Sequence, residues 1–262
     1  MSEQPVFYLP HGGGPCFFMP DPAGIWTGMA AFLRSIQSSL PAIPSAILVV
    51  SGHWEARGFQ LTRAEKPELI YDYYGFPEHT YALKYPVAGS PELAGKAADL
   101  LKAAGLDAGT DAKRGLDHGV FVPLKVAFAE AQIPVVELSL DHGLDPALHL
   151  KAGQALQPLR ADNVLIVATG MSFHNMRGYG DARFTAPSEE FDRWLGDTLA
   201  LEAEPRAEAL KAWQQAPHAR LCHPREEHLL PVMLAAGAAS GAGKQIYHEQ
   251  VLRTALSAYR FD

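Results

Sequence analysis

The stretch FYLPHGGGPCFF, residues 7–18, decides how the rest of the sequence is interpreted. A short apolar run predicts a strand that ends at Pro10, and His11 and three glycines follow it. The glycines could cradle a phosphate, or the histidine could hold a metal. A phosphate loop needs G-x-x-x-x-G-K-[ST] or G-x-G-x-x-G opening a helix, and Pro15 stands where that helix would begin. We therefore favour a tight glycine turn that leaves room for a ligand beside His11.

Further apolar runs predict strands that are buried on both faces of a sheet, because the runs are nearly continuous rather than alternating. The predicted strands are Pro5–Leu9, Ala46–Ser51, Pro134–Leu140, Asn163–Ala168 and Gln245–His248.

Helical patterns fall between these strands. Ile25–Leu40 is one, and Pro91–Ala104 is another, with Ser90 as its N-cap. Asp145-Pro146 opens a third helix, and Ser188 is expected to cap a fourth. The alternation predicts an α/β fold, with a central largely parallel or mixed β-sheet flanked by helices on both faces. No linker is evident, so residues 1–262 are expected to form a single domain.

Composition narrows the function classes. The chain has 262 residues, 48% of them hydrophobic, and a net charge of −7 with no long basic run, so nucleic acid is not an expected partner. The longest apolar stretch, residues 229–239, is too short to span a bilayer, so no membrane partner is expected. The two cysteines form no disulfide framework and the start does not resemble a signal peptide, which together predict a cytoplasmic protein. A homo-oligomer is compatible with the sequence, which does not fix the oligomeric state.

Several histidines occupy the same kind of position. His11, His53 and His174 each follow a predicted strand closely, and His118 lies on a loop before an apolar helix. If the strands are parallel neighbours, these side chains meet outside the carboxyl ends of the strands, the usual ligand site of an open α/β sheet. One histidine beside a strand is more often structural than a ligand, but three convergent imidazoles suit Zn, Fe or Cu.

A second histidine pair precedes the last apolar helix. His223 and His228 are five residues apart, so on one helix they would point to different faces and should not share a metal. Pro231 is expected near the start of that helix, which places the first helical residue close to Glu226 or Glu227 and His228 in the first turn.

The segment Lys66–Pro86 is rich in tyrosine and is neither clear helix nor clear strand. It could wall a pocket for a flat aromatic ligand, or it could be an ordinary packed excursion. Trp54 is a further pocket candidate, with a buried core position as the alternative. Arg177 could meet a substrate carboxylate, although an arginine on a loop is more often solvated.

Five motifs then fall in an order that resembles a known family. They are LPHGGGP, VSGHW, GLDHGVFVPL, SFHN and HPREEHLLP. The chain resembles the DOPA-dioxygenase (DODA) type of extradiol aromatic ring-opening dioxygenase, within the class III extradiol superfamily that includes the catalytic subunit of protocatechuate 4,5-dioxygenase. The resemblance runs over essentially the whole chain.

The resemblance implies a role for each histidine. His11, His53 and His228 correspond to metal ligands, and His174 corresponds to an acid/base residue that can itself close on the metal when no substrate is bound. His118 corresponds to a further active-site histidine near substrate and oxygen. Glu227 is the rival third ligand, because the protocatechuate enzymes use two histidines and a glutamate.

The implied cofactor is one divalent metal ion per chain. We expect Fe(II) for turnover, because Zn²⁺ has no redox chemistry, and Zn(II) in purified protein, because an all-histidine site binds it well. The implied reaction is extradiol cleavage of a catechol, DOPA-like or related, by O₂. Two alternatives use the same residues differently: a zinc-dependent hydrolase, which needs no O₂, and a non-enzymatic binding protein similar to the Memo family.

Overall fold

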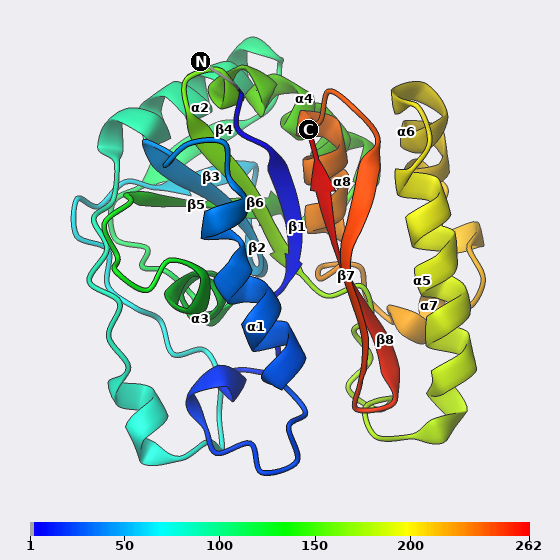
Figure 1. Ribbon diagram of the computed structural model, residues 1–262. Coiled ribbons are helices and arrows are strands. Elements are labelled where there is room, and N and C mark those ends of the chain that lie inside the picture. The colour runs from blue at the N-terminus through cyan, green and yellow to red at the C-terminus, as the bar shows by residue number, and fades with distance from the viewer. Residues whose placement is uncertain (1–2) are drawn as a thin grey trace.

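The computed structural model describes residues 3–262, and its centre is one eight-stranded sheet in the order β4-β3-β5-β2-β6-β1-β8-β7 (Figure 1). Strands β5, β2, β6 and β1 run parallel, β3 and β8 pair antiparallel to their neighbours β5 and β1, and β7 pairs antiparallel with β8. The strands are β1 (Val6–Pro10), β2 (Ala46–Ala56), β3 (Phe59–Thr62), β4 (Ala108–Asp111), β5 (Val135–Asp141), β6 (Val164–Gly170), β7 (Gly243–Val251) and β8 (Thr254–Phe261).

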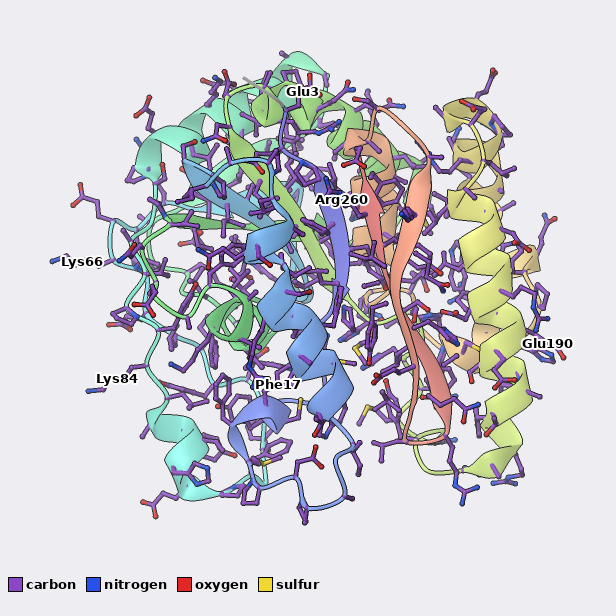
Figure 2. The ribbon with its side chains drawn as sticks, in the orientation of Figure 1. Glu3, Phe17, Lys66, Lys84, Glu190 and Arg260 are labelled. Carbon is purple, nitrogen blue, oxygen red and sulfur yellow. The ribbon has the colours of Figure 1, made fainter. Side chains whose placement is uncertain are left out.

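Helices cover both faces of the sheet, as predicted. Helices α1 and α3 contact each other on the face toward the viewer of Figure 1, whereas α4 and α8 pack together behind β6. Figure 2 shows side chains crowded between these layers, with Lys66, Lys84 and Glu190 pointing outward. The α-helices are α1 (Thr27–Ser35), α2 (Pro91–Ala103), α3 (His118–Ala127), α4 (Pro146–Leu156), α5 (Thr185–Leu199), α6 (Ala203–Lys211), α7 (Ala219–Cys222) and α8 (Leu230–Ala238).

The pairing of the central strands brings the predicted site residues to one edge of the sheet. Strand β6 lies between β1 and β2 and is parallel to both. The carboxyl ends of the three strands therefore meet, as the sequence predicted for the strands that precede His11, His53 and His174. None of the helices in residues 3–262 combines the length and apolarity that crossing a bilayer requires.

Some element boundaries differ from the sequence predictions. The first predicted helix is shorter than expected, since α1 ends at Ser35 and a 3₁₀ turn, Gln37–Ser39, follows. Strands β3, β4 and β8 were not predicted. The first two have only four residues each, which is too short for a clear apolar pattern.

Two predicted helix starts are wrong. Ser188 does not cap α5, which begins at Thr185; the Ser188 hydroxyl instead donates to the Thr185 carbonyl and accepts from the Ala255 amide of β8. Helix α8 begins at Leu230, not at Glu226 or Glu227, so His228 precedes it. Pro231 is its second residue, where a missing N–H costs nothing. His118 is likewise the first residue of α3 rather than part of a loop.

Helices α4 and α8 approach so closely that one side chain is excluded. A Cβ added at Gly153 of α4 would lie 2.1 Å from the Leu234 carbonyl oxygen of α8. We expect Gly153→Ala to lower the free energy of unfolding by about 1–3 kcal/mol, because overpacking must push the helices apart. Urea denaturation measures this change. The matched control is Gly95→Ala in α2, which meets nothing within 4 Å and should stabilise by up to about 1 kcal/mol through helix propensity. Equal effects of the two substitutions would contradict the packing argument.

Candidate metal centre and catechol pocket

The opening stretch folds as a turn that presents His11 directly after β1. Gly12 and Gly14 adopt positive φ values of 81° and 54°, which only glycine adopts readily. The Nδ1–H of His11 donates to the Gly12 carbonyl at 2.8 Å, so the unprotonated Nε2 points away from the turn.

Three imidazole Nε2 atoms converge at this edge of the sheet. His53, which lies on β2, places its Nε2 atom 3.3 Å from that of His11 and 3.2 Å from that of His228. The Nδ1–H of His228 donates to the Glu227 carboxylate at 2.9 Å, and the Nδ1 of His53 lies 3.5 Å from the Asp72 carboxylate. Because His11 and His228 are protonated on Nδ1, their Nε2 atoms carry lone pairs, and both lone pairs face the His53 ring. A cation or a proton between these nitrogens would offset the repulsion.

The donor set fits one divalent metal ion. Imidazole nitrogens bind Zn²⁺ at about 2.0–2.1 Å, and two such ligands at a near-tetrahedral angle are about 3.3 Å apart, as these atoms are. Burial keeps the pKa values of His11 and His228 well below the usual range. The neighbouring imidazoles act in the same direction, and at His228 burial outweighs the hydrogen bond to Glu227, which raises the pKa. Burial also lowers the pKa of His53 to about 4. The three rings are therefore uncharged at neutral pH, which is the form that ligates a metal.

The segment that carries His228 is fixed by its main chain. The His228 carbonyl accepts from the Met171 amide at 3.0 Å and from the Tyr8 hydroxyl at 3.1 Å. This approach depends on Gly170, since a Cβ there would lie 2.2 Å from the same oxygen. The end of β6 thereby positions the residue before α8.

His174 lies against His228 and contributes to the cavity wall. The two rings stack at 3.4 Å between centroids, and the Nδ1 atom of His174 lies 3.4 Å from the same Glu227 oxygen that His228 uses. Burial opposes ionisation of Glu227, but the hydrogen bonds with His174 and His228 outweigh it and hold the pKa of this carboxyl well below its usual range. Glu227 is therefore an anionic acceptor between two imidazoles.

Asp72 is a site residue that the sequence analysis missed. One of its carboxylate oxygens accepts from both the backbone N–H and the Nδ1–H of His118, at 2.9 and 2.8 Å. It thus satisfies an orphan amide at the start of α3 and orients the ring of His118, which lies 4.0 Å from the His53 ring. Burial opposes ionisation, but the hydrogen bond to His118 prevails and lowers the pKa of Asp72 to about 2. The sequence signal that could have identified Asp72 is its position as a single acidic residue within the aromatic run YDYYG.

The remaining candidates lie apart from the cluster. His223 is buried against Phe191 and Trp213 and hydrogen-bonds the Ser172 carbonyl, so it does not join His228. Trp54 is buried under the Arg114 guanidinium, in agreement with the core alternative. Arg177 is exposed and does not line the cavity.

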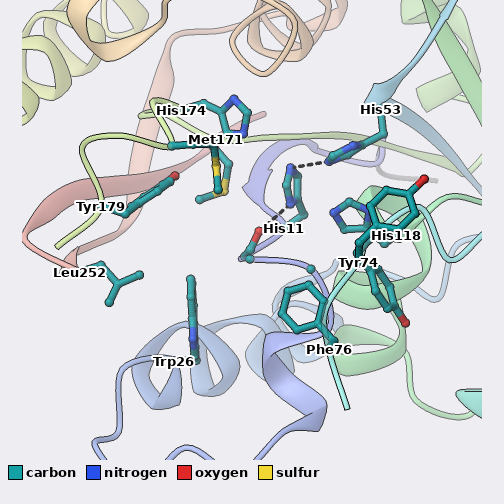
Figure 3. Close-up of a pocket in the computed structure, with 15 residues that line it drawn as sticks. His11, Trp26, His53, Tyr74, Phe76, His118, Met171, His174, Tyr179 and Leu252 are labelled. Carbon is teal, nitrogen blue, oxygen red and sulfur yellow. Dashed lines mark hydrogen bonds between the residues drawn. The ribbon is translucent and has the colours of Figure 1, made fainter. Parts of the chain in front are cut away.

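The segment Lys66–Pro86 does wall a cavity, through Tyr73, Tyr74 and Phe76, although its other tyrosines pack elsewhere. The cavity has a volume of about 380 Å³, within the range of small-molecule sites. His11, His53, His118 and His174 line it, and Figure 3 shows these rings on one side of the space and Trp26, Phe76 and Leu252 opposite or beside them.

A buried ionic network lies behind the cluster. The His53 amide donates to the Ser51 hydroxyl, which donates to Asp117 at 2.8 Å. Arg114 contacts Asp117 at 3.0 Å and Glu137 at 3.6 Å, and both carboxyls are fully buried. Burial, followed by the charge of Asp117, raises the pKa of Glu137 well above its usual range, so one arginine balances one carboxylate.

Fold and site together define an α/β enzyme whose histidine cluster can hold one divalent metal ion. A family model described as the catalytic LigB subunit of aromatic ring-opening dioxygenase matches residues 5–260. Dioxygenase tasH of Hapsidospora irregularis is 39% identical over 264 residues, covering 91% of this chain and 79% of that protein. The 4,5-DOPA dioxygenase extradiol of Portulaca grandiflora is 38% identical over 261 residues, covering 97% and 92%.

A solved structure supports the same relationship. The crystal structure of an uncharacterized protein from Escherichia coli K12 superposes with a TM-score of 0.78 at 26% identity, covering 99% of this chain and 100% of that one. The chain belongs to the LigB family of aromatic ring-opening dioxygenases. It is an extradiol ring-opening dioxygenase, an oxidoreductase that acts on a small aromatic molecule and O₂. The family assignment disfavours the hydrolase and Memo-like alternatives.

Removing Arg114 should destabilise the fold. Arg114→Met leaves the buried Asp117 carboxylate without a counter-charge, and breaking a buried pair in this way typically costs about 3–5 kcal/mol. We expect the lower end of that range, since the Arg114 side chain is 22% exposed. Urea denaturation measures the loss. Arg183→Ala, which breaks an ion pair of Asp181 with an arginine that is 86% exposed, is the control and should leave the stability nearly unchanged. Similar small effects for both variants would refute a structural role for the network.

Proposed function

We propose that the enzyme opens the ring of a catechol, with His11, His53 and His228 holding the metal ion. The observation that carries the proposal is the convergence of three Nε2 atoms whose opposite Nδ1 atoms face oxygen acceptors. Such acceptors fix the tautomer and orientation of metal-ligating histidines in known metal sites. In the reaction, the bond between one hydroxyl-bearing ring carbon and the neighbouring ring carbon without a hydroxyl breaks. Both oxygen atoms of O₂ enter the product.

Fe(II) is the proposed metal for turnover. Bound Fe(II) supplies the redox chemistry that activates O₂, whereas Zn²⁺, which suits the neutral histidine set and can occupy it in purified protein, supplies only Lewis acidity. The buried free thiols of Cys16 and Cys222 are consistent with a reducing location, and we place the enzyme in the cytoplasm.

His228, rather than Glu227, is the proposed third ligand. The Glu227 oxygen that faces the cluster already accepts from His228 and lies close to His174. In this position Glu227 orients two imidazoles, and it keeps the Nε2 atom of His228 free for the metal.

His174 is the proposed acid/base residue. With its Nδ1–H directed at Glu227, its Nε2 atom can accept a catechol hydroxyl proton and later return it to the ring-opened product. His118, whose Nδ1–H is held by Asp72, presents its other nitrogen to the same cavity, where it can hydrogen-bond the substrate or oxygen.

Metal content tests the ligand assignment. Protein purified without chelators should contain about one metal ion per chain by plasma mass spectrometry. His11→Ala and His228→Ala should each lose it, because two remaining imidazoles bind a divalent ion poorly. Glu227→Gln should keep the site with about 10–100-fold weaker affinity, since only the orientation of the ligand is disturbed. His142→Ala, at an exposed histidine after β5, is the control. Loss of metal in Glu227→Gln together with full retention in His228→Ala would assign the glutamate instead.

Turnover tests the role of His174. The His174→Ala variant, loaded anaerobically with Fe(II), should retain its metal and lose about 10²–10⁴-fold in kcat, the usual contribution of a positioned acid/base. Oxygen uptake and the absorbance of the ring-opened product measure kcat. Turnover like that of the wild type would refute the assignment.

A further inference from the structure

The cavity beside the histidine cluster contains no charged partner for a substrate. Within residues 3–262, its lining includes no lysine, arginine, aspartate or glutamate. Apart from the four histidines and the glycines of the opening turn, the wall is aromatic or aliphatic: Trp26, Tyr73, Tyr74, Phe76, Met171, Met176, Tyr179 and Leu252. The two ends of the cavity therefore differ in chemistry, with imidazoles at one and hydrocarbon at the other.

Two tyrosine hydroxyls of the hydrocarbon end are engaged elsewhere. The Tyr73 hydroxyl donates to the Thr80 carbonyl at 2.6 Å, and the Tyr179 hydroxyl donates to the Phe173 carbonyl at 2.8 Å. Both rings thus turn apolar surface toward the cavity while their hydroxyls face the protein. The Trp26 indole N–H and the Tyr74 hydroxyl remain at this end, and neither carries a charge that could pair with a charged substituent.

The apolar wall continues to the mouth of the cavity. Tyr74 and Met176 line the cavity and are nonetheless 88% and 73% exposed. Figure 3 shows Leu252 and Trp26 across the space from His53 and His118. A substituent that extends from a ring held at the histidines would therefore contact hydrocarbon along its path.

The nearest arginines in sequence do not change this. Arg177 and Arg253 follow the lining residues Met176 and Leu252, but both are exposed and neither lines the cavity. Asp72 and Glu227, the acids beside the lining histidines, already face His118 with His53 and His174 with His228. A carboxylate or ammonium group brought into the cavity would lose its water without gaining a partner, which strongly disfavours binding.

From this geometry we infer that the substrate is a catechol with an uncharged, apolar substituent, alkyl or aryl, rather than a catechol amino acid or acid. The inference rests on the proposed function, because the histidine end is taken to receive the two catechol oxygens. It assigns this chain a different substrate class from the one in the names of its DOPA-dioxygenase relatives.

Steady-state kinetics of the Fe(II)-loaded enzyme tests the inference. The panel is 4-methylcatechol, 4-butylcatechol, 3,4-dihydroxyphenylpropionate and DOPA. Each fully buried methylene is worth about 0.8 kcal/mol, or about four-fold in affinity. Because the mouth is open, we expect kcat/KM for 4-butylcatechol to exceed that for 4-methylcatechol by about ten-fold overall. The two charged substrates should fall at least about 100-fold below 4-butylcatechol.

Binding without turnover gives an independent measurement. Zn²⁺-loaded protein should bind 4-butylcatechol more tightly than 4-methylcatechol, with a negative heat-capacity change in calorimetry that marks apolar burial. DOPA should show weaker binding than either. This experiment needs no redox chemistry and reports on the cavity alone.

Met176→Lys places a positive charge at the apolar mouth of the cavity. Because Met176 is 73% exposed, we expect the fold to tolerate the substitution. It should lower kcat/KM for 4-butylcatechol and raise it for 3,4-dihydroxyphenylpropionate, while Arg177→Ala, the adjacent control, changes neither. Equal or better use of DOPA or the propionate by the unmodified enzyme, or a loss of their use in Arg177→Ala, would overturn the inference and leave the proposed function standing. No oxygen uptake with any catechol, with preferential binding of 4-butylcatechol retained, would overturn the proposed function instead.

Discussion

The site depends on the Nε2 atom of His53, which is held within hydrogen-bond distance of the Nε2 atoms of both His11 and His228, although these two atoms carry lone pairs. The other ring nitrogen of each histidine, Nδ1, faces an oxygen acceptor. The acceptors for His11, His53 and His228 are the Gly12 carbonyl, Asp72 and Glu227, respectively. Such an arrangement is unfavourable in an empty protein, and a cation at the centre relieves it. The parallel pairing of β1, β6 and β2 sets the positions of two of the histidines, and the contact of the His228 carbonyl with Met171 sets the third.

The surroundings of the cluster divide into two electrostatic regions. Behind it lie ionised or ionisable groups, Arg114 with Asp117 and Glu137, which are connected to His53 through Ser51. In front of it lies the cavity, where, within residues 3–262, the only ionisable lining groups besides tyrosines are the histidines themselves. The charged groups thus lie on the protein side of the cluster and the apolar wall lies on the solvent side. A substrate reaches the histidines from the cavity.

Much of the fold was predictable because its signals are local. Continuous apolar runs marked β1, β2, β5 and β6, and Pro91 and Pro146 marked two helix starts. The convergence of His11, His53 and His174 followed from strand direction, whereas the place of His228 followed from the family resemblance. Asp72 could not be assigned in this way, because its role requires the segment before α2 to return to the start of α3. The start of α8 was also misjudged, since tertiary bonds to the His228 carbonyl, and not propensity, fix the chain before it.

Much of the apolar wall comes from segments that carry none of the three proposed ligands. Trp26, Met176 and Leu252 lie at α1, in the loop after β6 and in the β7–β8 turn, away from every proposed ligand in the chain. These positions are free to diverge during evolution, so a relative can acquire a new substrate without rebuilding its metal centre. Tyr73 and Met171 are exceptions. Tyr73 adjoins Asp72, which orients His118, and the Met171 amide holds the His228 carbonyl, so a change of backbone at either would disturb the histidines. Divergence within the family should therefore be greatest at the mouth and least beside Asp72.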